Sequence, residues 1–120
     1  MAKHNETGKK GEEIAARFLA EKGYIILNSN WYFGKGELDI IAKKDNIMVF
    51  VEVKTRESNT FGEPETFVTR KKQKQLVKTA DAYIQLKNID LESRFDVISV
   101  ILGKNDFKIN HIEDAFYPLA

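Results

Sequence analysis

The stretch that most constrains the fold is residues 36–56, GELDIIAKKDNIMVFVEVKTR. Two apolar runs flank a short polar segment whose centre, the Asp-Asn pair at 45–46, tolerates positive φ angles. This pattern predicts an antiparallel β-hairpin. Two acids, Asp39 and Glu52, and a base, Lys54, nevertheless interrupt the apolar runs in the middle of the predicted strands.

The register of this hairpin decides where the charged side chains lie. A two-residue loop, or a four-residue loop with the same register, places Asp39 opposite Glu52 and Glu37 opposite Lys54, whereas a three-residue loop shifts the register by one residue. We prefer the even loops because they also sort the apolar residues onto one core face. The residues expected on that face are Leu38, Ile40, Ala42, Val49, Val51 and Val53.

The opposite face brings the two acids together. Directly opposed side chains have Cβ atoms about 5 Å apart, so Asp39 and Glu52 repel each other unless a cation lies between them. Mg²⁺ or Mn²⁺ suits such oxygen ligands, and Lys54 points to the same side, where it could hold a water or a phosphate. Glu-x-Lys is also common in strands, and Glu37 with Lys54 could be an ordinary surface ion pair. Spacing alone leaves a metal site and a solvated face equally open.

The rest of the chain is predicted to form helices and strands around this hairpin. The expected elements are a helix over 8–22, a strand over 24–33, the hairpin, an exposed loop over 57–68, a helix over 70–86, and strands over 94–102 and 107–113. Thr7 and Thr69 are the expected N-caps, and Gly23 is expected to end the first helix. The order strand, helix, strand predicts a crossover with a parallel strand pair, and therefore an α/β domain with a mixed sheet and packed helices.

Two further polar residues lie at the edges of apolar helix faces. Glu12 borders the apolar stripe of the first helix, although an acid in the first turn is also favoured by the helix dipole. Gln73 continues the apolar face of the second helix, although it could equally be a margin residue that is hydrogen-bonded locally.

The start of the second helix is strongly basic. Its sequence, RKKQKQLVK, contains Arg70, Lys71, Lys72, Lys74 and Lys78. Such a run could grip a phosphate backbone, or it could be a solvated helix face, which is the usual meaning of a charge run. The net charge of the whole chain is only +1, which argues against a protein that coats DNA.

Composition limits the remaining possibilities. A chain of 120 residues with 42% hydrophobic and 31% charged residues is expected to form one globular domain over 1–120. The absence of cysteine excludes disulfides and zinc–cysteine sites and favours a reducing compartment. No signal peptide or membrane-spanning run is evident in the sequence, so we expect a cytoplasmic protein.

The ordered motifs resemble a known family. Asp39, followed after twelve residues by Glu52-Val53-Lys54, resembles the PD-(D/E)xK nuclease signature, with Leu38 in place of the signature's proline. The segments GKKGEEIAARFLAEKGYIILNSNW, GELDIIA, VFVEVKTR, VTRKKQKQLVKTADAYI and RFDVISV resemble the YraN-type family of uncharacterised proteins. That family is similar to archaeal Holliday-junction resolvases and other restriction-endonuclease-like proteins, and the resemblance covers residues 8–100.

The resemblance implies a fold and a metal site. The implied fold is an αβββαβ core with a mixed sheet of four or five strands flanked by helices. Asp39, Glu52 and the main-chain carbonyl of Val53 would bind Mg²⁺ or Mn²⁺, and Lys54 would orient the attacking water.

The resemblance also gives roles to two helix residues. Glu12 matches the acidic residue that the resolvases carry on their first helix. Gln73 matches a glutamine that some of these nucleases place beside the site.

The leading hypothesis is therefore a metal-dependent endonuclease acting on DNA, including branched or damaged DNA. The alternatives are a non-catalytic nucleic-acid-binding module, or a scaffold of a DNA-processing complex, that retains the nuclease fold. Arg70, Lys71, Lys72 and Lys74 are the expected nucleic-acid contacts. A homodimer is expected by analogy with the resolvases, although the sequence identifies no dimer surface.

Overall fold

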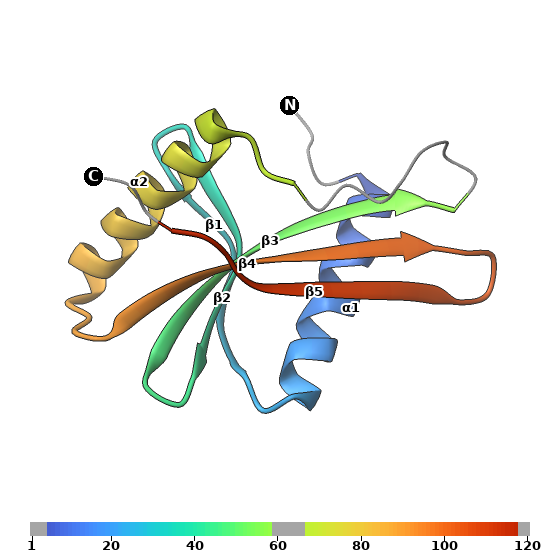
Figure 1. The fold of residues 1–120 in the computed structure, drawn as a ribbon, viewed down its shortest axis with the longest axis horizontal. Helices are drawn as coiled ribbons and strands as arrows, with labels where there is room; N and C mark the ends of the chain where they lie inside the picture. The colour runs from blue at the N-terminus through green and yellow to red at the C-terminus, as the bar shows by residue number, and fades with distance from the viewer. Residues whose placement is uncertain (1–4, 59–66, 118–120) are drawn as a thin grey trace.

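The computed structural model describes residues 5–58 and 67–117. The elements, in chain order, are α1 (Glu6–Glu21), β1 (Ile25–Phe33), β2 (Gly36–Lys44), β3 (Ile47–Glu57), α2 (Arg70–Lys87), β4 (Glu92–Leu102) and β5 (Phe107–Phe116) (Figure 1). In the described part of the chain, no helix is both long and apolar enough to cross a membrane.

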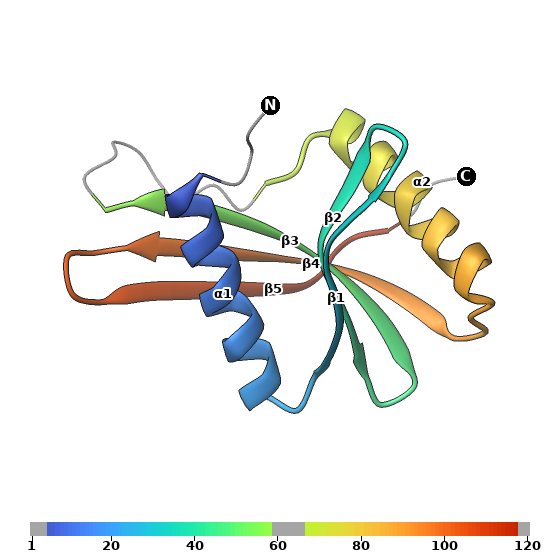
Figure 2. The ribbon, with the colours of Figure 1, turned by 180° about the vertical axis from the view of Figure 1, so that it is seen from behind.

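The five strands form one sheet in the order β1-β2-β3-β4-β5. Neighbouring strands are antiparallel except β3 and β4, which are parallel and joined by α2. Figure 2 shows α1 lying across β3, β4 and β5, with α2 beside the β1–β2 hairpin. The mixed sheet with flanking helices and one parallel crossover confirms the predicted fold class, which is consistent with a restriction-endonuclease-like fold.

Two apolar cores lie on opposite faces of the sheet. Under α1, the core joins Ala15 and Leu19 to strand residues that include Ile40 and Val49. Under α2, the core includes Leu76, Ala80 and Tyr83 of the helix together with Ile41 and Phe50 of the sheet. Neighbouring strand residues alternate between the two cores, as the period of two in a strand requires, so both faces of the hairpin are covered.

The first helix begins earlier than the sequence predicted. Its N-cap is Asn5, whose side-chain oxygen accepts a hydrogen bond from the Gly8 N–H at 2.8 Å. The prediction of Thr7 as the cap is wrong, because Thr7 lies within the first turn and donates instead to Glu57 at 3.3 Å. Asn and Thr both cap helices, so residue type alone did not decide between them.

The predicted cap of the second helix is confirmed. The hydroxyl of Thr69 accepts a hydrogen bond from the Lys72 N–H at 3.2 Å, and α2 begins at Arg70. Gly23, at the end of the first helix, has the positive φ angle of 93° that suits a residue following a C-cap.

The hairpin register is confirmed where the ladder is formed. Its pairs run from Ile40–Val51 to Lys44–Ile47, and Asp45 at the turn has a φ angle of 53°. These pairs are those of the predicted even loop. Beyond Ile40–Val51 the N-terminal part of β2 turns away from β3, so Asp39 and Glu52 do not form a ladder pair.

The predicted face of Leu38 is wrong. Leu38 packs in the core under α2, with Ile41, and not under α1 with Ile40. Two residues three positions apart share a face here, so the strict alternation breaks at Asp39. On the neighbouring strand, Asn30 lies between the pairs Ser29–Ile40 and Trp31–Leu38 and has a φ angle of 52°. The irregular backbone at Asp39 and Asn30 turns the Leu38 side chain towards the core under α2.

The predicted loop over 57–68 is only partly an exposed loop. Residue Glu57 still belongs to β3, and Val68 is buried in the core under α2. Positions 59–66 lie outside the described residues. Val68 was misassigned because a single apolar residue in a polar stretch carries no periodicity that shows its burial.

A buried polar network joins β4 to β5. Arg94 makes two hydrogen bonds of 2.9 Å to Asp96, and His111 and the Asp114 N–H contact the same carboxylate at 2.8 and 3.0 Å. Burial by itself would raise the pKa of Asp96, but hydrogen bonds from His111, Arg94 and the Asp114 N–H hold it below its usual value. The carboxylate therefore remains charged in the sheet because it has several donors.

Candidate active site

A polar pocket lies where the start of β2 diverges from the end of β3. Figures 1 and 2 show these two segments pointing in different directions, with the N-terminal end of α1 close to the end of β3. The pocket has a volume of about 350 Å³. Its lining residues are Asn5, Thr7, Gly8, Glu12, Glu37, Asp39, Glu52, Val53, Thr55 and Lys72.

Two glycines allow the helices to approach this region closely. A Cβ on Gly11 of α1 would collide with the side chain of Thr55 on β3. A Cβ on Gly36, at the start of β2, would collide with the side chain of Thr79 on α2. Glycine is required at both positions because it has no side chain, so its backbone can lie directly against a side chain of the neighbouring element. Gly11 thereby holds its neighbour Glu12 at the pocket.

Asp39 is held by the backbone of the neighbouring strand. Its Oδ2 accepts a hydrogen bond from the Val53 N–H at 2.9 Å. The other edge of β3 is paired with β4 at this position, where Val53 is the partner of Ile98. The carboxylate thus occupies the position that β2 backbone would fill if the ladder continued, which fixes its direction without a regular strand pair.

Glu52 lies against Asp39 and two lysines. The Glu52 side chain is 12% exposed, and its Oε2 is 3.9 Å from the Lys72 Nζ. Burial raises the pKa of Glu52, while Lys72, Lys54 and a hydrogen bond from the carboxyl group of Asp39 oppose that rise. The two acids therefore lie close enough for each to influence the pKa of the other, although they are not ladder partners.

Asp39 carries the strongest electrostatic perturbation in the pocket. Burial, and then the neighbouring charge of Glu52, raise its pKa to about 8, against the lowering effect of the Val53 N–H. Glu12 and Glu37 make smaller contributions to the same rise. A carboxylate surrounded by acids and removed from water favours either a proton or a cation, and a perturbed acid in a pocket is typical of a functional site.

Asn30 is a site residue that the sequence did not indicate. Its amide Nδ2 donates to Glu12 Oε1 at 2.9 Å and to Glu37 Oε2 at 3.4 Å. It can join the two acids because its positive φ angle directs it out of the regular strand pattern. Asparagine tolerates this conformation better than most residues, and that was the available signal in the stretch NSNW.

The structure brings Glu12, Asp39 and Glu52 together but does not bring Gln73 to them. Gln73 Nε2 donates to the Val68 carbonyl at 2.8 Å, and Gln73 lines a different groove on α2. This matches the local hydrogen bonding that was the alternative for this residue. Lys54 lies close enough to Glu52 to lower its pKa, and it follows Glu52 by two residues on β3.

The basic run at the start of α2 divides between two surfaces. Lys72 turns inward to the acidic pocket. Arg70 and Lys74 line a separate groove on the outer side of the helix, and Lys71 is exposed. The four residues predicted to contact nucleic acid therefore do not form one continuous patch.

The donor set suits a hard divalent cation with few protein ligands. Within residues 5–58 and 67–117, no three His, Asp or Glu side chains are arranged to hold a metal by themselves. Asp39 and Glu52 supply two carboxylates to one pocket, both with raised pKa values. Mg²⁺ typically takes one or two protein carboxylates and completes its shell with water and substrate oxygens, so the residues fit this ion.

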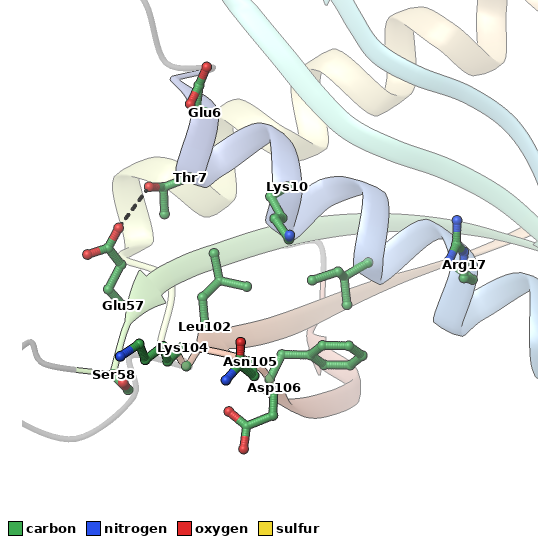
Figure 3. A pocket seen from close by; sticks show the side chains of 13 residues that line it. Glu6, Thr7, Lys10, Arg17, Glu57, Ser58, Leu102, Lys104, Asn105 and Asp106 are labelled. Carbon is green, nitrogen blue, oxygen red and sulfur yellow. Dashed lines mark hydrogen bonds between the residues drawn. The ribbon is translucent and has the colours of Figure 1, made fainter.

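A larger cavity of about 930 Å³ adjoins the acidic pocket, and Thr7 lines both (Figure 3). It lies between α1, from Glu6 to Arg17, and the turn between β4 and β5. Figure 3 shows the hydrogen bond from Thr7 to Glu57 at its edge. Its charged lining residues are Glu6, Lys10, Arg17, Glu57, Lys104 and Asp106.

In comparisons with known proteins, the family match and the similar relatives all point to one family. Residues 11–100 match the family described as "Uncharacterised protein family UPF0102". A UPF0102 protein of Flavobacterium psychrophilum is 53% identical over 117 residues, and one of Phocaeicola vulgatus is 50% identical over 118 residues. Each alignment covers 98% of this chain and 98% of the relative. These matches confirm the YraN-type resemblance, and the chain belongs to the UPF0102 family.

Proposed function

We propose that this protein is a metal-dependent endonuclease that hydrolyses phosphodiester bonds in DNA. The observation that carries the proposal is the placement of two partly buried acids in one pocket: Asp39, fixed by the Val53 N–H at 2.9 Å, and Glu52. Both have raised pKa values, and both open onto one pocket. A purely structural pair of acids would carry a repulsion that a well-packed sheet has no reason to keep.

Each residue has a distinct role in this proposal. Asp39 and Glu52 hold Mg²⁺ or Mn²⁺, and the carbonyl of Val53 is a further ligand. The ion, when bound, supplies Lewis-acid stabilisation of the charge that develops on the phosphate. Lys54 orients the attacking water or a phosphate oxygen, and Glu12 positions groups at the pocket through the shared partner Asn30.

The substrate proposed from the family resemblance is branched or damaged DNA. Paired cuts in a branched substrate would require two copies of the chain, so a homodimer remains part of this proposal. Gln73 is left with a structural role, since its amide already bonds the Val68 carbonyl.

A second candidate is a non-catalytic nucleic-acid-binding module. The observation that favours it is the position of Lys72, whose Nζ lies 3.9 Å from Glu52 and partly neutralises the acid that a metal would need. Under this alternative, Lys72 takes the place of the cation, and the pocket performs no chemistry.

A cleavage assay separates the two candidates. Wild-type protein and the variants Asp39→Asn and Glu52→Gln are incubated with duplex and four-way-junction DNA in Mg²⁺, Mn²⁺ or EDTA. The nuclease proposal expects cleavage by the wild type in metal and loss of cleavage in both variants and in EDTA. DNA binding without cleavage on any of these substrates would favour the binding module.

A further inference from the structure

The outer face of α2 forms a basic groove beside the end of β5. The groove has a volume of about 410 Å³. Its lining residues are Arg70, Gln73, Lys74, Val77, Lys78, Asp81 and Tyr117. Three cations face one carboxylate in this set, so the groove favours an anionic ligand.

The three cations form a regular row. Arg70, Lys74 and Lys78 follow one another at intervals of four residues, which places them on one side of the helix. At 1.5 Å per residue the row advances about 6 Å per step. All three are exposed, and within the described residues none of them takes part in an ion pair. A row of available charges suits a ligand with repeating negative groups, such as a polynucleotide backbone.

Tyr117 adds an aromatic ring to this row. It lies next to the last residue of β5, lines the same groove and is 72% exposed. An exposed aromatic beside a line of cations is the arrangement that binds single strands, because each unpaired base offers a flat face for stacking. A duplex keeps its bases stacked inside, so Tyr117 would gain little from a paired substrate.

The larger cavity beside α1 lacks this charge asymmetry (Figure 3). Its three cations, Lys10, Arg17 and Lys104, are balanced by the carboxylates of Glu6, Glu57 and Asp106. The groove on α2 is therefore the better surface for a phosphate backbone.

We propose that the groove of Arg70, Lys74, Lys78 and Tyr117 binds an unpaired polynucleotide strand. The cations contact successive phosphates, and Tyr117 stacks on a base. The first turn of α2 connects this groove to the acidic pocket, since Arg70 lies in the groove and Lys72 lies 3.9 Å from Glu52. The inference rests on the proposed nuclease function and narrows its substrate to nucleic acid with a single-stranded segment next to the cleaved bond.

Binding is measured by fluorescence anisotropy in EDTA, where metal-dependent cleavage does not occur. The probes are labelled single-stranded DNA, single-stranded RNA of the same sequence, and the corresponding DNA duplex. The variants are Tyr117→Leu, Tyr117→Phe and the double variant Lys74→Ala/Lys78→Ala. The control is Lys104→Ala/Lys108→Ala, which removes the same charge from exposed positions on the β4–β5 hairpin. Circular dichroism verifies that each variant is folded.

The proposal expects the wild type to bind a single strand more tightly than the duplex. Tyr117→Leu weakens single-strand binding roughly 5- to 160-fold, since a stacked base contributes about 1–3 kcal/mol, and Tyr117→Phe restores it. The double lysine variant lowers the slope of log affinity against log salt by about 1.4, more than the control does. The two single-stranded probes show whether the strand is DNA, RNA or either.

Two results would overturn the inference. One is single-strand affinity in Tyr117→Leu and in the double lysine variant within twofold of the control; the other is tighter binding of the duplex. Cleavage in Mg²⁺ is scored separately. Cleavage of fully paired DNA without single-strand binding would refute the inference and leave the nuclease proposal intact. Groove-dependent binding of a single strand without cleavage of any substrate would support the groove and refute the nuclease proposal.

Discussion

Asp39 accepts a hydrogen bond from the Val53 N–H at 2.9 Å, at the point where β2 has left β3. A side chain thus takes the place of a backbone partner, and Glu52, the residue before Val53, lines the same pocket and raises the pKa of this carboxyl group. This relationship places two acids in one pocket, and it gives each of them a measurable property.

Replacing Asp39 with asparagine should separate stability from activity. The amide oxygen can still accept from the Val53 N–H, while the repulsion with Glu52 disappears. We expect the metal-free protein to become more stable by roughly 1–2 kcal/mol at pH 8 and to lose Mg²⁺ binding and cleavage. Thermal melting in EDTA and calorimetric titration measure both effects. Melting well below the wild type would show that the acids are structural partners.

The stability of the metal-free protein should depend on pH in two opposite ways. The pKa of Asp39 is raised from 3.8 to about 8, so the folded state binds more protons than the unfolded state between these values. The free energy of unfolding should therefore fall as the pH rises from about 4 to about 8. The pKa of Asp96 is lowered, so its contribution is present above its unfolded value of 3.8 and is lost as the pH falls below it.

Urea denaturation in EDTA across this pH range measures the profile. Asp39→Asn should reduce the fall in stability between about pH 4 and about pH 8. It should leave the loss of stability below pH 3.8 unchanged. Added Mg²⁺ should restore stability at pH 8 in the wild type but not in the variant, because an ion that binds only the folded state stabilises it. If the free energy of unfolding of the wild type does not fall between about pH 4 and about pH 8, the electrostatics described for the pocket are wrong.

Replacing Lys54 with alanine should separate chemistry from metal binding. Lys54 is proposed to act on water or phosphate and not on the ion. We expect cleavage to fall by roughly 10²- to 10⁴-fold, while Mg²⁺ affinity is unchanged or slightly higher because a nearby positive charge is gone. Lys108→Ala, at an exposed position on β5, is the matched control. Equal cleavage by Lys54→Ala and the control would remove Lys54 from the mechanism.

The two neighbouring lysines of α2 should behave differently. Lys72 lies 3.9 Å from Glu52 and is the largest influence opposing the rise in its pKa, whereas Lys71 is exposed. Lys72→Ala should raise the pKa of Glu52, and Lys71→Ala should leave it unchanged. Carboxyl ¹³C NMR titration of the metal-free protein reports the value directly. The same titration curve in both variants would mean that Lys72 does not contact Glu52 in solution.

Gly11 should be intolerant of even a methyl group. Its Cβ would collide with the Thr55 side chain, so Gly11→Ala must move α1 away from β3. We expect a loss of about 1–3 kcal/mol, as for overpacking in a core, and weaker cleavage because Glu12 moves with the helix. The double variant Gly11→Ala/Thr55→Ser removes the colliding Cγ2 methyl group and leaves a smaller side chain whose hydroxyl can rotate, so it should recover part of the stability. Chemical denaturation measures both variants.

The hairpin and the class of fold follow from local sequence patterns. The turn at Asp45 and the alternation of apolar residues favour the even-loop register, since a slip of one residue would move the apolar set to the other face. Ile40 to Lys44 accordingly pair with β3 as expected. The crossover through α2 followed from the order of elements, because a strand, a helix and a second strand bring the strands back parallel.

The way in which the two acids come together depends on tertiary packing. Local pattern describes a regular ladder, but β2 pairs with β3 only from Ile40 onward. The break before Ile40 turns Leu38 to the other core and lets the Asp39 carboxyl replace a backbone partner. The positions of Asn30 between two acids and of Lys72 beside Glu52 arise from contacts between segments far apart in the sequence. Packing of helices onto both faces of the sheet fixes these distances, and no local periodicity encodes them.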